Sequence, residues 1–235
     1  ILELIEKEKI ENTIFVPAVI LFLIQHPEVK NVDWSSLKTV VYGASPIAQD
    51  TLEKAIEIMD CEFWQVYGLT ETNGAVTFLE PEDHDPSKNK LRSCGKPGYG
   101  AEIRIEDENG KDLAVGEVGE IVIKSGNNMK GYWNNPKATE ESVVDGWFYS
   151  GDAGYFDEDG FLYIHDRVKD MIVSGGENIY PAEVENALMS HDDILDAAVV
   201  GIPDEKWGET VKGFVVLKEG VELKEEEIIS YARTQ

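Results

Sequence analysis

The chain contains little cysteine, and this shortage bears on metal binding and on cellular compartment. Cys61 and Cys94 are the only cysteines in 235 residues, and neither belongs to a CxxC pair or has a histidine at the spacing of a zinc site. We therefore expect no structural zinc site. Isolated thiols are typical of a reduced compartment, so a cytoplasmic location is predicted.

Positive charge is also scarce. The chain has 21 lysine and arginine residues against 46 aspartate and glutamate residues, and its net charge is −25. Binding to a nucleic-acid backbone requires clustered lysine and arginine, so nucleic acid is excluded as an expected partner. An anionic membrane surface is disfavoured for the same reason.

Long hydrophobic runs are missing as well. The longest apolar stretch, residues 14–24, contains Pro17 and ends before Gln25-His26-Pro27. A membrane-spanning helix needs about 18 consecutive apolar residues, so no transmembrane segment is predicted. The chain opens with ILELIEKEKIE, a charged amphipathic pattern that differs from a secretory signal.

The first part of the chain has the pattern of an α/β layer. Residues 38–42 and 61–68 are predicted strands, and residues 1–10 and 46–60 are predicted helices. Each of the two strands runs into a turn that contains glycine. In open α/β sheets, ligands bind at the carboxyl ends of the strands, so these turns are candidate binding segments.

The remainder of the chain is predicted to be richer in strands. Short strands and hairpin turns at Asn109-Gly110 and Asp159-Gly160 indicate a β subdomain that is either a small barrel-like unit or a distorted sheet. Beyond residue 168, a helix starts at Pro181, two strands follow, and a last helix is expected over residues 223–235. The fold class predicted is therefore α/β followed by α+β.

One short stretch, Tyr67-Gly68-Leu69-Thr70-Glu71, carries the chemistry of a nucleotide site. An aromatic ring can stack on a purine, and glycine lets the backbone approach a ligand closely. A hydroxyl can bond a phosphate oxygen, and a carboxylate can bind Mg²⁺. The structural alternative is a strand-to-helix turn in which Thr70 or Thr72 is the N-cap.

The stretch resembles the [Tyr/Phe]-Gly-x-Thr-Glu signature of the AMP-forming adenylating enzymes, which include acyl- and aryl-CoA synthetases, luciferases and the adenylation domains of peptide synthetases. Further segments resemble this family's motifs in the family's order, with Ser150 where threonine is usual. These segments are Gly43–Pro46, Gly119-Glu120 through Gly131-Tyr132-Trp133, Tyr149–Asp152, Asp166–Asp170 and Ser174–Asn178. The resemblance covers essentially the whole chain and is nearest to fatty-acyl-CoA synthetases.

The resemblance implies a domain organisation. Residues 1–92 would be the αβ portion of a large adenylate-forming domain, and residues 93–167 its β-rich subdomain. Residues 168–235 would be an incomplete, mobile C-terminal domain.

The resemblance also implies roles for individual residues. Thr70 would bond a phosphate, Glu71 would bind Mg²⁺, and Lys169 would be the hinge of the C-terminal domain. The walls of the adenine site would be formed by Gly43, Ala44, Ser45, Gln65, Tyr67 and Gly68. The ribose would be held by Asp152, and Arg167 would reach the ribose or a phosphate. The pantetheine arm of CoA would pass Ser174, Gly175 and Gly176.

Structural alternatives exist for several of these residues. Asp152 could be a turn aspartate, and Arg167 could form a surface salt bridge with Asp166 or Asp170. The pair Gly175-Gly176 could be a plain hairpin turn. The three tryptophans near these motifs are expected to be packing residues: Trp133, Trp147 and Trp207.

The implied reaction is the activation of a carboxylic acid with ATP and Mg²⁺ and its transfer to CoA. Apolar residues after the motif, Val76, Phe78 and Leu79, suggest a fatty-acyl pocket, or else ordinary strand packing. An aryl- or short-chain-acid CoA ligase, an adenylation domain that loads a carrier protein, and a non-catalytic nucleotide-binding protein are the alternatives.

Two elements that the family uses are not found in this sequence. These are a Ser/Thr/Gly-rich loop ending in Gly-Lys and a catalytic lysine in a Pro-x-x-x-x-Gly-Lys context. Lys218 and Lys224 have different surroundings. The chain is therefore expected to be an internal fragment of a ligase that is inactive by itself.

Overall fold

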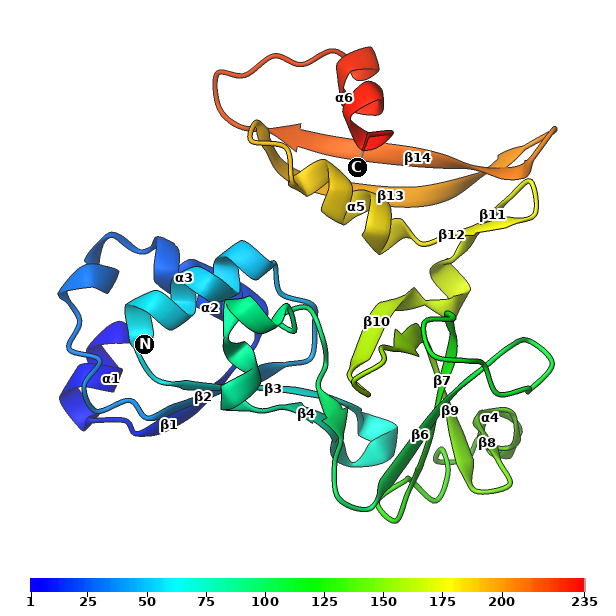
Figure 1. The fold of residues 1–235 in the computed structure, drawn as a ribbon, viewed down its shortest axis with the longest axis horizontal. Coiled ribbons are helices and arrows are strands. Elements are labelled where there is room, and N and C mark those ends of the chain that lie inside the picture. Colours follow the sequence, from blue (N-terminus) through cyan, green and yellow to red (C-terminus); the bar gives the residue numbers. More distant parts are fainter. Residues whose placement is uncertain (235) are drawn as a thin grey trace. The chain divides into compact units, whose positions relative to one another are not determined.

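The computed structural model describes residues 1–234 and places the strands of this part of the chain in three sheets (Figure 1). The strands are β1 (Asn12–Phe15), β2 (Thr39–Gly43), β3 (Glu62–Leu69), β4 (Gly74–Leu79), β5 (Lys96–Pro97), β6 (Ala101–Glu106), β7 (Gly119–Ser125), β8 (Val143–Val144), β9 (Trp147–Phe156), β10 (Leu162–Arg167), β11 (Ile172–Ser174), β12 (Glu177–Ile179), β13 (Ile194–Asp204) and β14 (Gly208–Leu217). The α-helices are α1 (Leu2–Glu8), α2 (Pro17–Gln25), α3 (Gln49–Met59), α4 (Pro136–Ser142), α5 (Pro181–Met189) and α6 (Glu225–Ala232). The 3₁₀ helices are η1 (Pro27–Asn31), η2 (Thr70–Thr72), η3 (Pro81–His84), η4 (Pro86–Lys88) and η5 (Val168–Asp170).

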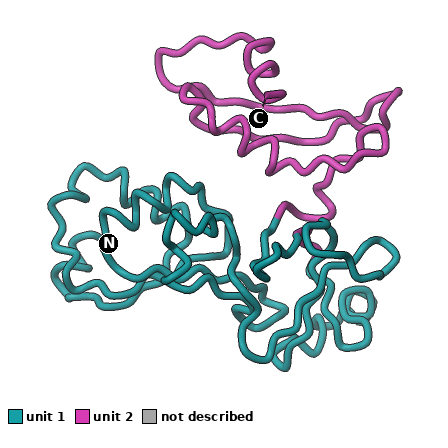
Figure 2. The backbone as a smooth tube through the Cα atoms, in the orientation of Figure 1, with its two compact units in different colours: residues 1–150, 155–164 teal, residues 151–154, 165–235 magenta. Residues whose placement is uncertain are grey.

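The chain divides into two compact units (Figure 2). Unit 1 comprises residues 1–150 and 155–164, and unit 2 comprises residues 151–154 and the chain from residue 165 onward. The domain limits predicted from the sequence remain predictions.

The first sheet of unit 1 has the strand order β1-β2-β3-β4-β5. β1, β2 and β3 are parallel, whereas β4 is antiparallel to β3. Figure 1 shows α2 and α3 on the same face of this sheet. The edge strand β1 leaves Ile14 76% exposed, and Phe22 on α2 is 70% exposed.

Helix α3 forms because its apolar residues recur at helical spacing. Leu52, Ala55 and Met59 are buried and join Val40 and Phe63 of the sheet in one hydrophobic cluster. The helix ends at Asp60, which adopts φ 44° and donates its N–H to the Ile56 carbonyl. Residues spaced by three and four positions lie on one helix face, which explains this burial.

The second sheet of unit 1 has the order β10-β9-β7-β6, with β8 paired to β9. The predicted barrel-like closure is wrong, because β6 and β10 are the two edges of an open sheet in the described residues. The predicted hairpin at Asn109-Gly110 forms only one isolated bridge, between Glu106 and Asp112. Without a full strand in this segment, no strand is available to join the two edges.

Unit 2 contains the third sheet, in the order β12-β11-β14-β13. Helix α5 begins at Pro181, as predicted, and packs against β13. Ile172, Leu188, Ile194 and Val199 form the buried cluster of this unit. Helix α6 lies within the last predicted helix, whose final residue, Gln235, lies outside the described residues.

The tryptophans differ from one another in their environments. Trp133 is 91% exposed, so the prediction that it packs is wrong. Trp147 is half-buried and lies 4.0 Å from the guanidinium of Arg104. Trp207 is 49% exposed, and its indole lies against Gly175.

Within residues 1–234, no helix combines the length and the apolar character needed to cross a membrane.

Candidate functional site

The two candidate turns of unit 1 leave neighbouring parallel strands at the same edge. Gly43, the last residue of β2, pairs with Val66 of β3. The turn Gly43–Pro46 and the stretch that starts at Tyr67 therefore follow paired positions in the sheet. Ala44 in this turn has φ 70°, and both Ala44 and Ser45 are exposed. The structure thus brings these two predicted segments together at the carboxyl ends of the strands, where α/β sheets bind ligands.

Gly43 and Gly68 are required by the sheet itself. A Cβ atom on Gly43 would lie 2.2 Å from the carbonyl oxygen of Val66. A Cβ atom on Gly68 would lie 2.0 Å from the carbonyl oxygen of Gly74, at the point where the register of β3 and β4 shifts. Both glycines therefore allow close approach of two strands, whatever ligand binds beyond them.

Gln65 and Tyr67 are two positions apart on β3, so their side chains lie on the same face of the strand. Tyr67 is 8% exposed and belongs to the second hydrophobic cluster, together with Val76 and Ile121. The side-chain oxygen Oε1 of Gln65 is buried and has no hydrogen-bond partner. A buried acceptor without a partner is unfavourable unless a ligand or water supplies a donor. This oxygen therefore fits a ligand with an N–H group, such as the amino group of adenine.

The turn after β3 separates two threonines by function. The hydroxyl of Thr72 accepts from Leu69 N at 2.9 Å and lies 3.0 Å from Leu69 O and 2.8 Å from Gly74 O. Thr72 is 1% exposed and stabilises the turn from within η2, whose N-cap is Leu69. The alternative in which Thr70 or Thr72 is the N-cap is therefore wrong. Thr70 is exposed and is therefore available to a ligand.

Glu71 is held by a segment that lies far along the chain. The hydroxyl of Tyr132 donates to Glu71 Oε1 at 2.8 Å, and Met129 N donates to the Glu71 carbonyl at 2.6 Å. Burial raises the pKa of Tyr132, and so do its hydrogen bond to Glu71 and the charge of that carboxylate. Tyr132 lies in a segment that resembles a family motif, and the resemblance implies no role for it. The partner of Tyr132 could not be read from local pattern.

The carboxylate of Glu71 suits a metal ion whose other ligands are supplied by a bound nucleotide. Among the described residues, no group of three or more His, Cys, Asp and Glu side chains is placed to hold a metal ion. Mg²⁺ in phosphate-transfer sites is commonly bound by one or two carboxylates together with the substrate phosphates. One carboxylate at an exposed turn therefore fits Mg²⁺ that arrives with a nucleotide.

In unit 2, the structure brings Asp152 and Arg167 together. Arg167 Nη1 lies 2.9 Å from Asp152 Oδ1, and the Asp152 side chain is 12% exposed while that of Arg167 is 49% exposed. The two residues predicted to bind the nucleotide are thus neighbours in this unit. Asp166 accepts from Ala182 N at the start of α5, at 2.9 Å.

The remaining predicted residues of unit 2 lie before and within a hairpin. Lys169 is exposed in η5. Ser174 ends β11 and pairs with Glu177 across the turn. Gly175 and Gly176 have φ values of 63° and 90°, as a two-residue hairpin turn requires. The hairpin-turn alternative is thus confirmed for this pair.

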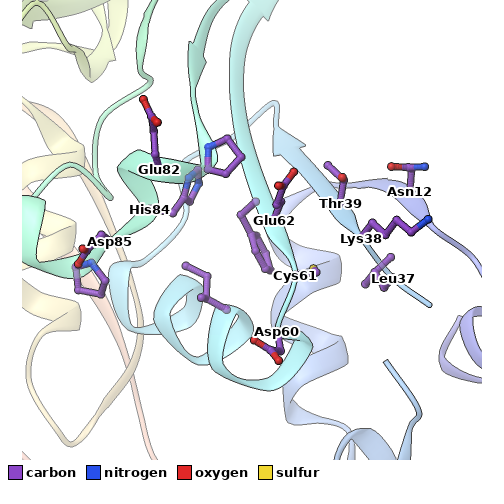
Figure 3. A pocket seen from close by; sticks show the side chains of 14 residues that line it. Asn12, Leu37, Lys38, Thr39, Asp60, Cys61, Glu62, Glu82, His84 and Asp85 are labelled. Carbon is purple, nitrogen blue, oxygen red and sulfur yellow. The ribbon is translucent and has the colours of Figure 1, made fainter. Parts of the chain in front are cut away.

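A large open cavity of about 980 Å³ lies elsewhere in unit 1 (Figure 3). Its walls include Asn12, Thr39 and Glu62, the first residues of β1, β2 and β3. Across the cavity lie His84 and Asp85, which follow β4. The cavity is therefore at the amino ends of the parallel strands, whereas the candidate site is at their carboxyl ends. The cavity and the nucleotide motif are different places.

Two curated relatives show what the chain resembles. The fatty acid–acyl-carrier-protein ligase ScoC of Streptomyces coeruleorubidus is 43% identical over 218 residues, which are 93% of this chain and 42% of that protein. The medium/long-chain-fatty-acid–CoA ligase FadD8 of Mycobacterium tuberculosis is 44% identical over 218 residues, which are 93% of this chain and 38% of that protein. The chain thus spans less than half the length of these relatives.

Two solved structures share the fold. The amide bond synthetase McbA of Marinactinospora thermotolerans superposes with a TM-score of 0.91 and 37% identity, covering 99% of this chain and 48% of that protein. The o-succinylbenzoate–CoA synthetase of Bacillus subtilis, in complex with ATP and a magnesium ion, gives a TM-score of 0.84 and 36% identity over 98% of this chain and 46% of that protein.

Family models cover both ends of the chain. A model described as AMP-binding enzyme matches residues 1–133, and one described as AMP-binding enzyme C-terminal domain matches residues 183–235. The first model alone covers more than half of the sequence. The fold and the motif turns agree with this match, and the chain belongs to the AMP-binding enzyme family.

Proposed function

We propose that this chain is part of an AMP-forming acid–CoA ligase. In the first step, a carboxylate oxygen of the acid attacks the α-phosphorus of Mg·ATP, the bond to the leaving oxygen breaks, and an acyl-adenylate and pyrophosphate form. In the second step, the thiolate of CoA attacks the acyl carbon, and AMP leaves. The protein contributes mainly by positioning the reactants and by stabilising charge at phosphorus.

The observation that carries this proposal is the common edge of β2 and β3. The Gly43–Pro46 turn and the Tyr67–Glu71 stretch follow paired strand positions. A purine between the backbone of the turn and the ring of Tyr67 would direct its phosphates toward the exposed Thr70 and the carboxylate of Glu71. Gln65 Oε1 offers the acceptor that an adenine amino group needs.

The pair in unit 2 supports a role in nucleotide binding. A carboxylate can accept from both vicinal hydroxyls of a ribose, and an adjacent guanidinium can donate a charge-assisted hydrogen bond to it. The 2.9 Å contact between Asp152 and Arg167 fits this chemistry. Lys169 would act as the hinge, and Ser174, Gly175 and Gly176 would adjoin the pantetheine arm.

A fatty acid is the substrate that we propose. Both relatives described above are named as fatty-acid ligases, whereas the Bacillus neighbour is named for an aromatic acid, so aryl and short-chain acids are the alternative. Val76 and Leu79 are 3% and 0% exposed. They serve strand packing in this structure and do not discriminate between acids.

A carrier protein is the alternative acceptor. ScoC is named as a ligase that loads an acyl-carrier protein, whereas FadD8 is named as a CoA ligase. We propose CoA and a cytoplasmic location, the compartment in which ATP and CoA are abundant and cysteines remain thiols, as Cys61 and Cys94 do here.

The test is pyrophosphate release by the full-length protein with acetate, benzoate, octanoate or palmitate, with CoA, with a carrier protein bearing its pantetheine arm, or with neither. We expect octanoate or palmitate to give the highest kcat/KM and CoA to be required for turnover. Asp152→Ala should raise the KM for ATP at least about tenfold, because one lost charged hydrogen bond weakens binding by about 1.5–3 kcal/mol. Turnover of amino acids without CoA would contradict the proposal.

A further inference from the structure

The carboxylate of Glu71 has a fixed partner that has no assigned role. We propose that Tyr132 is a positioning residue for Glu71, holding one carboxylate oxygen so that the other is presented to the Mg²⁺ ion that accompanies the nucleotide. This inference rests on the proposed function, because it requires Glu71 to be the metal-binding residue. The phenol donates to Oε1 at 2.8 Å, and Oε2 lies outside that hydrogen bond.

The position of Tyr132 is determined by helix α4. Tyr132 N donates to Thr139 Oγ1 at 2.9 Å, and the same hydroxyl donates to the carbonyl of Asn135 at 3.0 Å. Gly131 has φ 148°, and a Cβ atom there would lie 2.8 Å from Thr139 Cγ2. The chain therefore passes close to the helix at Gly131, and the direction in which Tyr132 leaves is restricted.

Glu71 is also held through its backbone, in addition to the side-chain hydrogen bond from Tyr132. Met129 N donates to the carbonyl of Glu71 at 2.6 Å. The backbone and the side chain of Glu71 are thus both bound by residues 129–132. Free rotation of the Glu71 side chain is reduced before any ion arrives, and this lowers the entropy lost on metal binding.

The chemistry of the pair suits metal binding. A neutral phenol can donate one hydrogen bond to a carboxylate without neutralising its charge. Residues that hold a metal ligand in place commonly change metal affinity or activity by about 10–100-fold when they are removed. Tyr132 is 37% exposed, so loss of its hydroxyl should leave the fold intact.

The experiment compares the Mg²⁺ dependence of variants of the full-length protein. ATP binding is measured by calorimetry without the acid substrate, and pyrophosphate release is measured with it, each over a series of Mg²⁺ concentrations. For Tyr132→Phe, we expect the half-saturating Mg²⁺ concentration to rise about tenfold in both measurements, whereas kcat at saturating Mg²⁺ changes less than about threefold.

Tyr149→Phe is the matched control. Tyr149 donates to Glu106 Oε2 at 2.9 Å, so this variant removes an equivalent tyrosine–glutamate hydrogen bond in the same unit. It should leave the half-saturating Mg²⁺ concentration unchanged. Thr139→Val is a second test, which retains the phenol and removes the acceptor that restrains it, and a smaller shift in the same direction is expected.

Glu71→Gln distinguishes the positioning role of Tyr132 from the metal-binding role of Glu71. A strong loss of Mg²⁺ dependence in Glu71→Gln together with wild-type behaviour in Tyr132→Phe and Thr139→Val would overturn the positioning role alone. Wild-type Mg²⁺ dependence in Glu71→Gln would overturn both the positioning role and the metal role of Glu71. A shift of equal size in Tyr149→Phe would show a general effect of stability and would also refute the positioning role.

Discussion

At the scale of single residues, the motif near Tyr67 contains residues that stabilise the turn and residues that are available to a ligand. Thr72 is used by the turn itself, whereas Thr70 and Glu71 present polar groups beyond it. The residue types were readable from the sequence because the five positions are contiguous. The sequence did not reveal which threonine stabilises the turn and which is exposed. That difference depends on the path of the backbone between Leu69 and Gly74.

Long-range partners could not be predicted at this scale. Glu71 and Tyr132 are separated by 61 positions in the sequence, and the pair Asp152–Arg167 joins β9 to the end of β10. Without aligned relatives, no local pattern indicates which acid meets which donor. For Asp152 and Arg167, the resemblance implied roles at a common nucleotide and did not predict that the two side chains pair.

Gly68 provides the test at the residue scale. Gly68→Ala would bring a Cβ atom to 2.0 Å from the Gly74 carbonyl, and backbone on both sides prevents an easy adjustment. We expect a loss of about 3 kcal/mol in the free energy of unfolding, at the upper end of overpacking effects. Chemical denaturation of the full-length protein measures it.

Gly126→Ala is the control, because no atom lies within 4 Å of a Cβ built there. This variant should differ from the wild type by less than about 0.5 kcal/mol. If Gly68→Ala were equally harmless, the close approach of β3 and β4 would not be the reason for glycine at that position.

At the scale of elements, the strands and helices of the first sheet followed the hydrophobic pattern closely. The strand predicted over residues 38–42 is β2, and the helix predicted over residues 46–60 contains α3. The barrel-like closure failed because the segment between β6 and β7 is made of turns, and an Asn-Gly pair identifies a turn without ensuring the strand that should follow it.

Segments that connect the elements are bound by contacts that the sequence does not reveal. Lys90 Nζ lies 2.7 Å from both Asp157 Oδ2 and Asp159 Oδ2, which are in the β9–β10 hairpin. His84 of η3 is 5% exposed, with Nε2 3.1 Å from the Tyr42 hydroxyl and Nδ1 2.9 Å from the Glu80 carbonyl. The Lys90 ion pairs and the His84–Tyr42 contact thus connect the chain after β4 to β2 and to the β9–β10 hairpin, which are distant in sequence.

His84 makes the attachment of η3 sensitive to pH. Burial lowers the pKa of His84 from the usual 6.5, so the unfolded chain binds this proton more readily than the folded chain does. The stability contributed by neutral His84 is therefore complete above about pH 6.5 and is lost progressively as the pH falls below that value. Thermal unfolding of the full-length protein between pH 7.5 and pH 5.5 measures this loss.

Replacing His84 with a residue that does not titrate should reduce the loss of stability on acidification. We expect the midpoint of unfolding to fall less on acidification in His84→Gln than in the wild type. Identical pH profiles for the wild type and His84→Gln would show that His84 does not link stability to pH.

At the scale of the whole molecule, the predicted mixture of α/β and α+β parts is confirmed, and each unit has its own buried cluster. The fold class was predictable because parallel strands with intervening helices and a later strand-rich segment differ in hydrophobic period. The assignment of Gly151–Gly154 to unit 2 was not predictable, since these four residues lie in the middle of β9.

Lys169 is the residue at which the proposed alternation between units can be tested. It is exposed in η5, close to the point where the chain passes from unit 1 to unit 2. Lys169→Pro should restrict backbone change there, because proline fixes φ. We expect thioester formation to slow at least about tenfold while adenylate formation changes less than about twofold, as befits a hinge.

Single-turnover measurements of the two half-reactions, with the full-length protein, separate these effects. Lys54→Ala, at an exposed position of α3, should alter neither step. Equal losses in both half-reactions for Lys169→Pro would remove the hinge assignment.

The strand β1 has a practical consequence for anyone who produces this stretch of polypeptide on its own. It is one of the two edge strands of its sheet in the described residues, and its Ile14 is three-quarters exposed. An unpaired row of backbone N–H and C=O groups next to apolar side chains is a template for another copy. Self-association through this border, and hence poor recovery from expression, is the behaviour to expect unless further polypeptide or an added charge shields it.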